Sequence, residues 1–154
     1  MFEDMLSVFV YPSLPVTTWL AADEKDAIMA RLRRDEQDGR LDVDSILPLQ
    51  RINALPGMVS VFSCTGHKER FMVGGYLTLR VSCEVAEMLD GSLIGRLWED
   101  GLIYHVAKEW QSALDAAGKS VPGVIYTFRF YLGQFEKVCD ALCRYTKEST
   151  NAVL

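Results

Sequence analysis

The amino-acid sequence predicts an α+β fold, and two observations lead to this prediction. Stretches whose apolar residues recur every three or four positions alternate with short runs rich in β-branched and aromatic residues. In chain order these segments read helix, helix, strand, strand, helix, strand, strand, helix. We therefore expect duplicated strand-strand-helix units that form a mixed or antiparallel sheet, covered by helices on one face and preceded by two N-terminal helices.

Length and composition predict a single domain over residues 1–154. With 49% hydrophobic and 24% charged residues, the chain has the balance of an ordinary globular domain. A chain of this length can bury a core without disulfides or a structural metal. Residues 1–18 predict an edge strand and a loop, because an apolar run is followed by Pro12 and Pro15.

Residues 19–56 form a helical part. Apolar residues at helical spacing predict a first, highly charged surface helix that ends near Gly39. A second helix follows, with Asp42 or Asp44 as its N-cap, and it ends at Pro56. One of these two carboxylates is therefore expected to accept hydrogen bonds from the start of that helix.

Residues 57–154 hold the two strand-strand-helix units. The first unit has strands over 58–64 and 71–82, and the polar loop between them predicts a hairpin. Ser82 is expected to cap the helix that follows, which the Asp-Gly pair at 90–91 is expected to split into two pieces.

The second unit has strands over 102–110 and 124–132, with Pro122 and Gly123 in the loop between them, and a final amphipathic helix. Its second strand resembles that of the first unit, because Thr78-Leu79-Arg80-Val81 aligns with Thr127-Phe128-Arg129-Phe130 at an offset of 49 residues. This repeat is the evidence for a duplication.

Charge and apolar patterning exclude several classes of protein. The chain carries 16 lysines and arginines against 21 aspartates and glutamates, a net charge of −5. That field repels phosphate, which argues against a generic nucleic-acid coat protein. No apolar run approaches the roughly 18 residues of a membrane span, and the N-terminus lacks the cationic start of a secretory signal. We expect a cytoplasmic protein whose four cysteines stay reduced.

The alternation of side chains along the strands predicts a polar sheet face opposite the helices. In the third strand, Tyr104 fits the pattern of residues that point into the core. The next residue, His105, is therefore predicted to point to the polar face. The residues predicted on the polar face are Tyr76, Thr78, Arg80, His105, Thr127 and Arg129. Because a guanidinium fork matches two oxygens, the two arginines predict an anionic small molecule as ligand. The alternative is that each arginine is solvated or pairs with an acid such as Glu109.

The loop after the first strand is the second candidate site. It brings together Ser63, Cys64, Thr65, Gly66, His67 and Lys68. Gly66 permits a positive φ, so successive N–H groups are able to converge on an anion, with Lys68 adding charge. His67 is able to donate a hydrogen bond or to act as an acid or base. The alternative is an exposed hairpin tip without a ligand.

No metal is expected from these residue types, and they do not identify a catalytic residue. Cys64 and His67 have the spacing of two metal ligands, with Cys83 or His105 as further donors, but the chain has only two histidines and no C-x-x-C pair. A catalytic thiol at Cys64 lacks a visible partner to orient its histidine. Cys139 and Cys143, one helical turn apart, are expected to pack in the core.

From Lys25 to about Ser82 the layout resembles the family of wybutosine-synthesis tRNA methyltransferases. The shared order is a charged helix, the link Asp-Gly-Arg-Leu-Asp at 38–42, a helix ending at Ile52-Asn53, and a strand that runs into the polar loop. The family has a Ser-Ser-Cys-Ser-Gly-Arg stretch there.

Three positions of that stretch, Ser63, Cys64 and Gly66, correspond, and Thr65 is a conservative change. Phe62 and His67 stand where the family has serine and arginine, so a hydroxyl and a fixed positive charge are missing. The resemblance implies an α+β fold of duplicated units and a cleft for S-adenosylmethionine and a modified nucleoside, with tRNA as partner.

Two functions follow as expectations. The first is a non-catalytic module that binds or sequesters a nucleotide-like anion in a cleft between the 63–67 loop and the pair Arg80 and Arg129. The alternative is an S-adenosylmethionine-dependent tRNA methyltransferase of the wybutosine type. No membrane partner is expected, and either function is compatible with an oligomer. Fold class alone does not choose between them.

Overall fold

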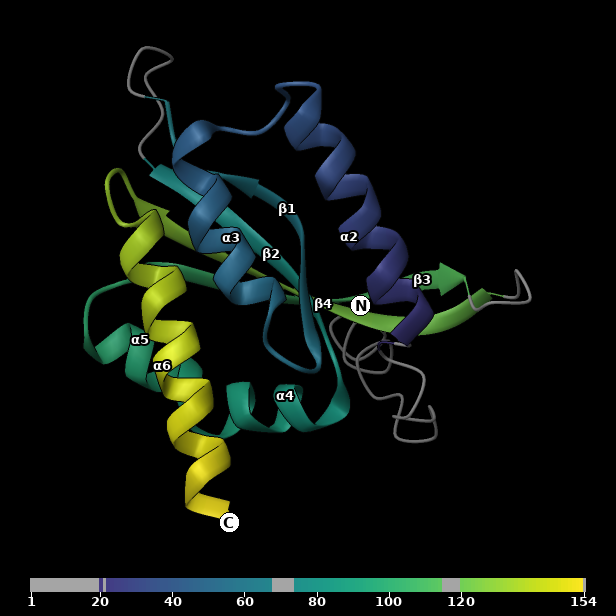
Figure 1. Ribbon diagram of the computed structural model, residues 1–154. Coiled ribbons are helices and arrows are strands. Elements are labelled where there is room, and N and C mark those ends of the chain that lie inside the picture. The colour runs from purple at the N-terminus through teal and green to yellow at the C-terminus, as the bar shows by residue number, and fades with distance from the viewer. Residues whose placement is uncertain (1–19, 21, 68–73, 115–119, 154) are drawn as a thin grey trace, which may run out of the picture.

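Four strands form one antiparallel sheet in the order β1-β2-β4-β3 (Figure 1). They are β1 Met58–Cys64, β2 Gly74–Val81, β3 His105–Leu114 and β4 Ser120–Tyr131. This is a computed structural model that describes residue 20 and residues 22–67, 74–114 and 120–153, so the strand and loop predicted over residues 1–18 lie outside the described part. The α+β class is confirmed, and the sheet is antiparallel rather than mixed.

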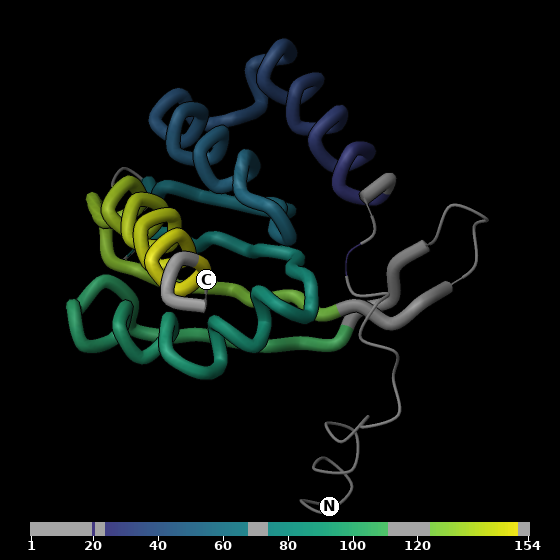
Figure 2. The backbone as a smooth tube through the Cα atoms, turned by 60° about the horizontal axis from the view of Figure 1, so that its bottom comes forward, coloured from purple at the N-terminus to yellow at the C-terminus, as the bar shows by residue number. Residues whose placement is uncertain are grey.

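The helices follow the predicted order, with two before the sheet. They are α2 Ala22–Gln37, α3 Ile46–Asn53, α4 Cys83–Met88, α5 Ile94–Glu99 and α6 Phe135–Val153. A 3₁₀ turn, η2 Val43–Ser45, leads into α3, and a π turn, η4 Leu89–Leu93, joins α4 to α5. Figures 1 and 2 show α3 and α6 side by side on one face of the sheet. Within the described ranges, no helix combines the length and apolar character needed to cross a bilayer.

The core lies between one face of the sheet and the helices α3 to α6. No described residue of α2 belongs to it, and α2 contacts Arg80 on the other face, so the helices do not all cover one face as the sequence predicted. Alternate residues of the two central strands point into the core, and all are buried: Leu77, Leu79, Val81, Val124, Tyr126, Phe128 and Phe130. The apolar stripe of α6 packs against them through Val138, Leu142 and Tyr145. The side-chain phase predicted for β2 and β4 is therefore correct.

The helix after β2 is not broken at Asp90-Gly91 but continues through η4. Ser82 caps it as predicted, accepting a hydrogen bond from the Val85 amide at 3.4 Å. Asp90 then accepts hydrogen bonds from the Tyr126 hydroxyl and the Lys108 ammonium, both at 2.7 Å. The π turn keeps the helix intact while Asp90 ties it to β3 and β4.

Pro122 and Gly123 lie inside β4, not in the loop where the sequence placed them. Pro122 is the register partner of Ser112 on β3, whereas the pairing of β4 with β2 begins only at Ile125. Among the described strands, this end of β4 therefore has a neighbour on one side only. Within sheets, proline is found mainly at such edge positions.

A buried polar pair fixes α3 to β1. The Ser60 amide donates to Asn53 Oδ1 at 2.7 Å, and Asn53 Nδ2 donates to Ser60 Oγ at 3.0 Å. The register of β1 against β2 shifts between Ser60 and Phe62, so the Asn53 side chain satisfies backbone at an irregular point of the ladder. Both residues are buried, which makes the pair important for stability.

We expect Asn53→Ala to lower the free energy of unfolding by about 1–3 kcal/mol, because it leaves the buried Ser60 amide without its acceptor. Urea unfolding followed by circular dichroism measures this change. Gln50→Ala, one turn earlier on the exposed side of α3, is the matched control and should stay within about 0.5 kcal/mol of the parent. Equal unfolding midpoints for the two variants would contradict the assigned role.

Candidate functional site

The candidate site begins with a row of side chains that crosses all four strands. Cys64 pairs with Tyr76, Tyr76 with Arg129, and Arg129 with His105. Directly opposed residues in a sheet point to the same face, so these four side chains share the face opposite the core. We call them the outer row. The predicted polar face is therefore present, and His105 lies beside Arg129 on it.

Arg129 is exposed, and its guanidinium carbon lies 5.8 Å from the centre of the Tyr76 ring. It forms no ion pair with another described residue. Arg129 thus presents a permanent charge beside an aromatic ring on a rigid strand. This geometry suits an anion attached to a planar group.

Arg80 lies on the same face as Arg129, but it is buried and forms an ion pair with a carboxylate. Its side chain is 5% exposed, and Nε lies 2.8 Å from Oε1 of Glu24 on α2. Burial lowers the pKa of Arg80, and the neighbouring Glu24 charge opposes that effect. Arg80 therefore holds α2 on the sheet, and the structure does not bring the two arginines to one ligand.

The two threonines of the polar face lie between the arginines. Thr78 and Thr127 are register partners, and their hydroxyl oxygens are 3.0 Å apart. Thr78 is buried, while Thr127 is half-buried. Their mutual hydrogen bond leaves Thr127 as the threonine of this pair that a ligand on the face reaches.

Aromatic side chains border the outer row. Tyr131, two residues after Arg129 on β4, is 54% exposed, and its ring centre lies 4.7 Å from that of Tyr104. Tyr104 was expected in the core, but it precedes β3 and is exposed. The alternation between core and polar face in β3 therefore begins only at His105. Tyr104 instead adds to the aromatic side chains that border the polar face.

The loop after β1 follows the predicted backbone, with a φ of 98° at Gly66. A Cβ there would meet the end of the partly exposed Leu132 side chain, which is able to move, so the positive φ is the main reason for glycine at this position. The loop also binds an anionic group, which is a carboxylate of the protein itself. Asp42 Oδ2 accepts hydrogen bonds from the Thr65 amide at 3.3 Å and the Thr65 hydroxyl at 3.1 Å.

The sequence analysis did not place Asp42 near this loop. It occupies the N-cap position of η2, but its carboxylate makes no capping hydrogen bond. Its Oδ1 instead lies 3.7 Å from Nε2 of His67, and the donor atoms of Asp42, Cys64 and His67 all lie within 4.8 Å of one another. The sequence pattern around Asp42 is that of a helix cap. Only its contact with His67 in the folded protein shows that Asp42, Cys64 and His67 form a cluster. Lys68 lies outside the described residues.

Two shallow hollows flank the loop. One of about 370 Å³ borders Ser63 and Phe62 together with Arg31 and Arg40, and another of about 520 Å³ borders Thr65 and Gly66. Neither is lined by Arg80 or Arg129. In the part of the chain that the structure describes, these two hollows therefore do not join the loop to the two arginines.

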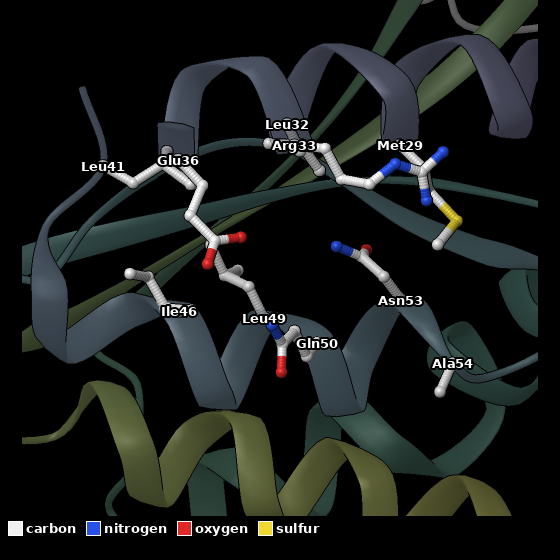
Figure 3. Close-up of a pocket in the computed structure, with 10 residues that line it drawn as sticks. All are labelled: Met29, Leu32, Arg33, Glu36, Leu41, Ile46, Leu49, Gln50, Asn53 and Ala54. Atoms are coloured by element: carbon white, nitrogen blue, oxygen red, sulfur yellow. The ribbon is translucent and has the colours of Figure 1, made fainter. Parts of the chain in front are cut away.

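Two further hollows lie away from the predicted residues. Figure 3 shows one of about 230 Å³ between α2 and α3, with Glu36 pointing down from α2 and Asn53 pointing up from α3. The other, of about 720 Å³, lies between residues 54–57, α4 and α6. None of the residues that the sequence singled out for binding lines either hollow.

Comparison with known proteins found no matching family model, no matching curated protein and no matching solved structure.

We expect Arg80→Ala to destabilise the fold by about 3 kcal/mol, because it leaves the Glu24 carboxylate in a poorly solvated position without its cation. Arg129→Ala, on the same face but exposed, should change stability by less than about 0.5 kcal/mol. Chemical denaturation of both variants measures the difference. If both lose the same stability, the distinct environments of the two arginines would be refuted.

We expect Cys64 to react first with an alkylating reagent in the reduced native protein. Burial raises the pKa of the Cys139 and Cys143 thiols, and burial together with the Glu87 carboxylate raises the pKa of Cys83. A raised pKa lowers the thiolate fraction that reacts. Timed alkylation with peptide mapping tests this, and the unfolded protein, in which the four rates should converge, is the control. Earlier labelling of Cys139 would contradict it.

Proposed function

We propose that this protein binds a nucleotide-like anionic small molecule on the polar face around the outer row, without transforming it. The observation that carries the proposal is the exposed Arg129 guanidinium beside the Tyr76 ring. Arg129 would take the phosphate or carboxylate oxygens, because its fork matches two of them. Tyr76 and the Tyr104–Tyr131 pair would offer surfaces on which a base stacks.

Arg80 supplies a comparison from within the molecule. We infer that the two strand-strand-helix units are duplicates, because Thr78 pairs directly with Thr127, its equivalent at an offset of 49 residues. The strand order β1-β2-β4-β3 then places equivalent strands symmetrically about this pair. Arg80 and Arg129 are equivalent positions. Arg80 binds the Glu24 carboxylate, which supports an anion as the partner of Arg129.

Net charge favours a small ligand over a long nucleic acid. The chain carries a net charge of −5, so extended phosphate polymers meet repulsion away from Arg129 and His105. A mononucleotide presents its charge at one end and its base at the other, which fits one arginine flanked by aromatic rings. Thr127 and His105 would add hydrogen bonds at the edge of the ligand.

The resemblance to wybutosine-synthesis enzymes supports an alternative proposal, an S-adenosylmethionine-dependent tRNA methyltransferase. In that case the methionine carboxylate would take the place of phosphate at Arg129, and the adenine would stack on the same rings. The loop after β1, whose Ser63, Cys64 and Gly66 match the family stretch, lies next to the outer row through Cys64. Phe62 and His67 remain departures from that stretch.

Calorimetric titration with mononucleotides and, separately, with S-adenosylmethionine tests the proposal. We expect a nucleotide to bind, and Arg129→Gln to weaken it about 10- to 100-fold, since a charge-assisted hydrogen bond contributes about 1.5–3 kcal/mol. Arg34→Gln, an exposed arginine near the end of α2, is the matched control and should bind normally.

The outcome separates the two proposals. A nucleotide recovered chemically unchanged, with no binding of S-adenosylmethionine, supports the binding module. Transfer of a labelled methyl group to tRNA would establish the methyltransferase. Unchanged affinity in Arg129→Gln would remove the outer row from either function.

A further inference from the structure

A second kind of site lies at the end of the outer row. Asp42, Cys64 and His67 come from three different parts of the fold: the start of η2, the last residue of β1 and the loop beyond it. Each offers one ligand atom, and these atoms lie within 4.8 Å of one another. We infer that these three residues bind a divalent metal ion of the zinc class, with a fourth position open to water or a ligand.

The spacing of the ligand atoms fits such an ion. Bonds of roughly 2.0–2.3 Å in a tetrahedral arrangement separate the ligand atoms by about 3.3–3.7 Å. Asp42 Oδ1 and His67 Nε2 are 3.7 Å apart, too far for a hydrogen bond but suited to two ligands of one ion. The remaining separations are at most 4.8 Å, and side-chain rotation would bring these atoms to bonding distance of one ion.

The carboxylate of Asp42 is already oriented for this role. Thr65 donates two hydrogen bonds to Oδ2, from its amide and its hydroxyl, and so turns Oδ1 toward His67. At an N-cap an aspartate ordinarily binds the amides of the first helical turn, yet Asp42 leaves η2 without that bond. Support of a ligating carboxylate by neighbouring hydrogen-bond donors is a common feature of metal sites.

The chemistry of the three donors selects the metal. Thiolate and imidazole favour zinc over calcium or magnesium, which prefer oxygen ligands alone. The His67 and Asp42 side chains are 26% and 33% exposed, so an ion and a water molecule can reach them. Three protein ligands and one open position are the arrangement of zinc sites that act on bound molecules, whereas structural zinc sites are closed by four.

This inference does not rest on the proposed nucleotide function. Metal binding is measured on the full chain without any nucleotide, so a negative result for one proposal does not count against the other. The sequence argued against a metal because the chain has only two histidines and no C-x-x-C pair. The third donor, Asp42, lies 23 residues before Thr65 and joins Cys64 and His67 only in the fold.

The test is a titration of the reduced, metal-free full chain with Zn²⁺ in competition with a coloured chelator, and with Co²⁺ as a spectroscopic substitute. We expect one ion per chain. The Co²⁺ complex should show the visible bands of tetrahedral cobalt and a thiolate-to-cobalt charge-transfer band in the near ultraviolet. Zn²⁺ should also protect Cys64 from alkylation in the unaltered protein, a readout that needs no variant.

Variants assign the ligands. Asp42→Asn, Cys64→Ser and His67→Gln should each weaken Zn²⁺ binding by more than about 100-fold, and Cys64→Ser should abolish the charge-transfer band. Thr65→Val, which removes a hydroxyl that orients Asp42, should weaken binding by about 10- to 100-fold. Cys83→Ser, which alters a partly buried thiol on α4, is the matched control and should bind normally.

A cobalt complex without the thiolate band, or Zn²⁺ that leaves Cys64 alkylation unchanged, would overturn the inference. Equal Zn²⁺ affinity in Cys64→Ser and Cys83→Ser would overturn it as well. Circular dichroism of each variant confirms that the comparison is made between folded proteins.

Discussion

The antiparallel pairing of β2 with β4 is the constraint on which the rest of the structure depends. Its register sets both faces of the sheet at once: Leu77 opposite Phe128 in the core, and Tyr76 opposite Arg129 on the polar face. A shift of one residue would exchange these faces, burying a charge and exposing the aromatic core. The hydrophobic stabilisation of the core therefore also holds Cys64, Tyr76, Arg129 and His105 in one row.

The two arginines show how similar strand positions acquire different roles. Arg80 and Arg129 both point away from the core, but α2 places the Glu24 carboxylate against Arg80 alone among the described arginines of β2 and β4. A buried guanidinium without a partner would be strongly destabilising, so the ion pair and the position of α2 support each other. Arg129 is exposed to solvent, which keeps it available for recognition at little cost to the fold.

Much of the fold was predictable from patterns that are local in sequence. Helical spacing located α2, α3 and α6, alternation gave the phase of β2 and β4, and Ser82 marked the start of α4. The predictions were wrong where contacts with distant parts of the chain override a local sequence preference. Asp90-Gly91 reads as a break, but hydrogen bonds from Tyr126 and Lys108 accompany a continuous helix. Pro122 lies where β4 has a single neighbour among the described strands.

By itself, the sequence determined the α+β class and the side-chain alternation that assembles Tyr76, His105 and Arg129 on one face. Only the tertiary structure decided that Arg80 is buried against Glu24 and that Asp42 turns from a helix cap toward Cys64 and His67. The physical reason is the range of the interactions. Periodicity and capping arise between residues a few positions apart, whereas these ion pairs and donor clusters form between segments that meet only when the sheet and helices have packed.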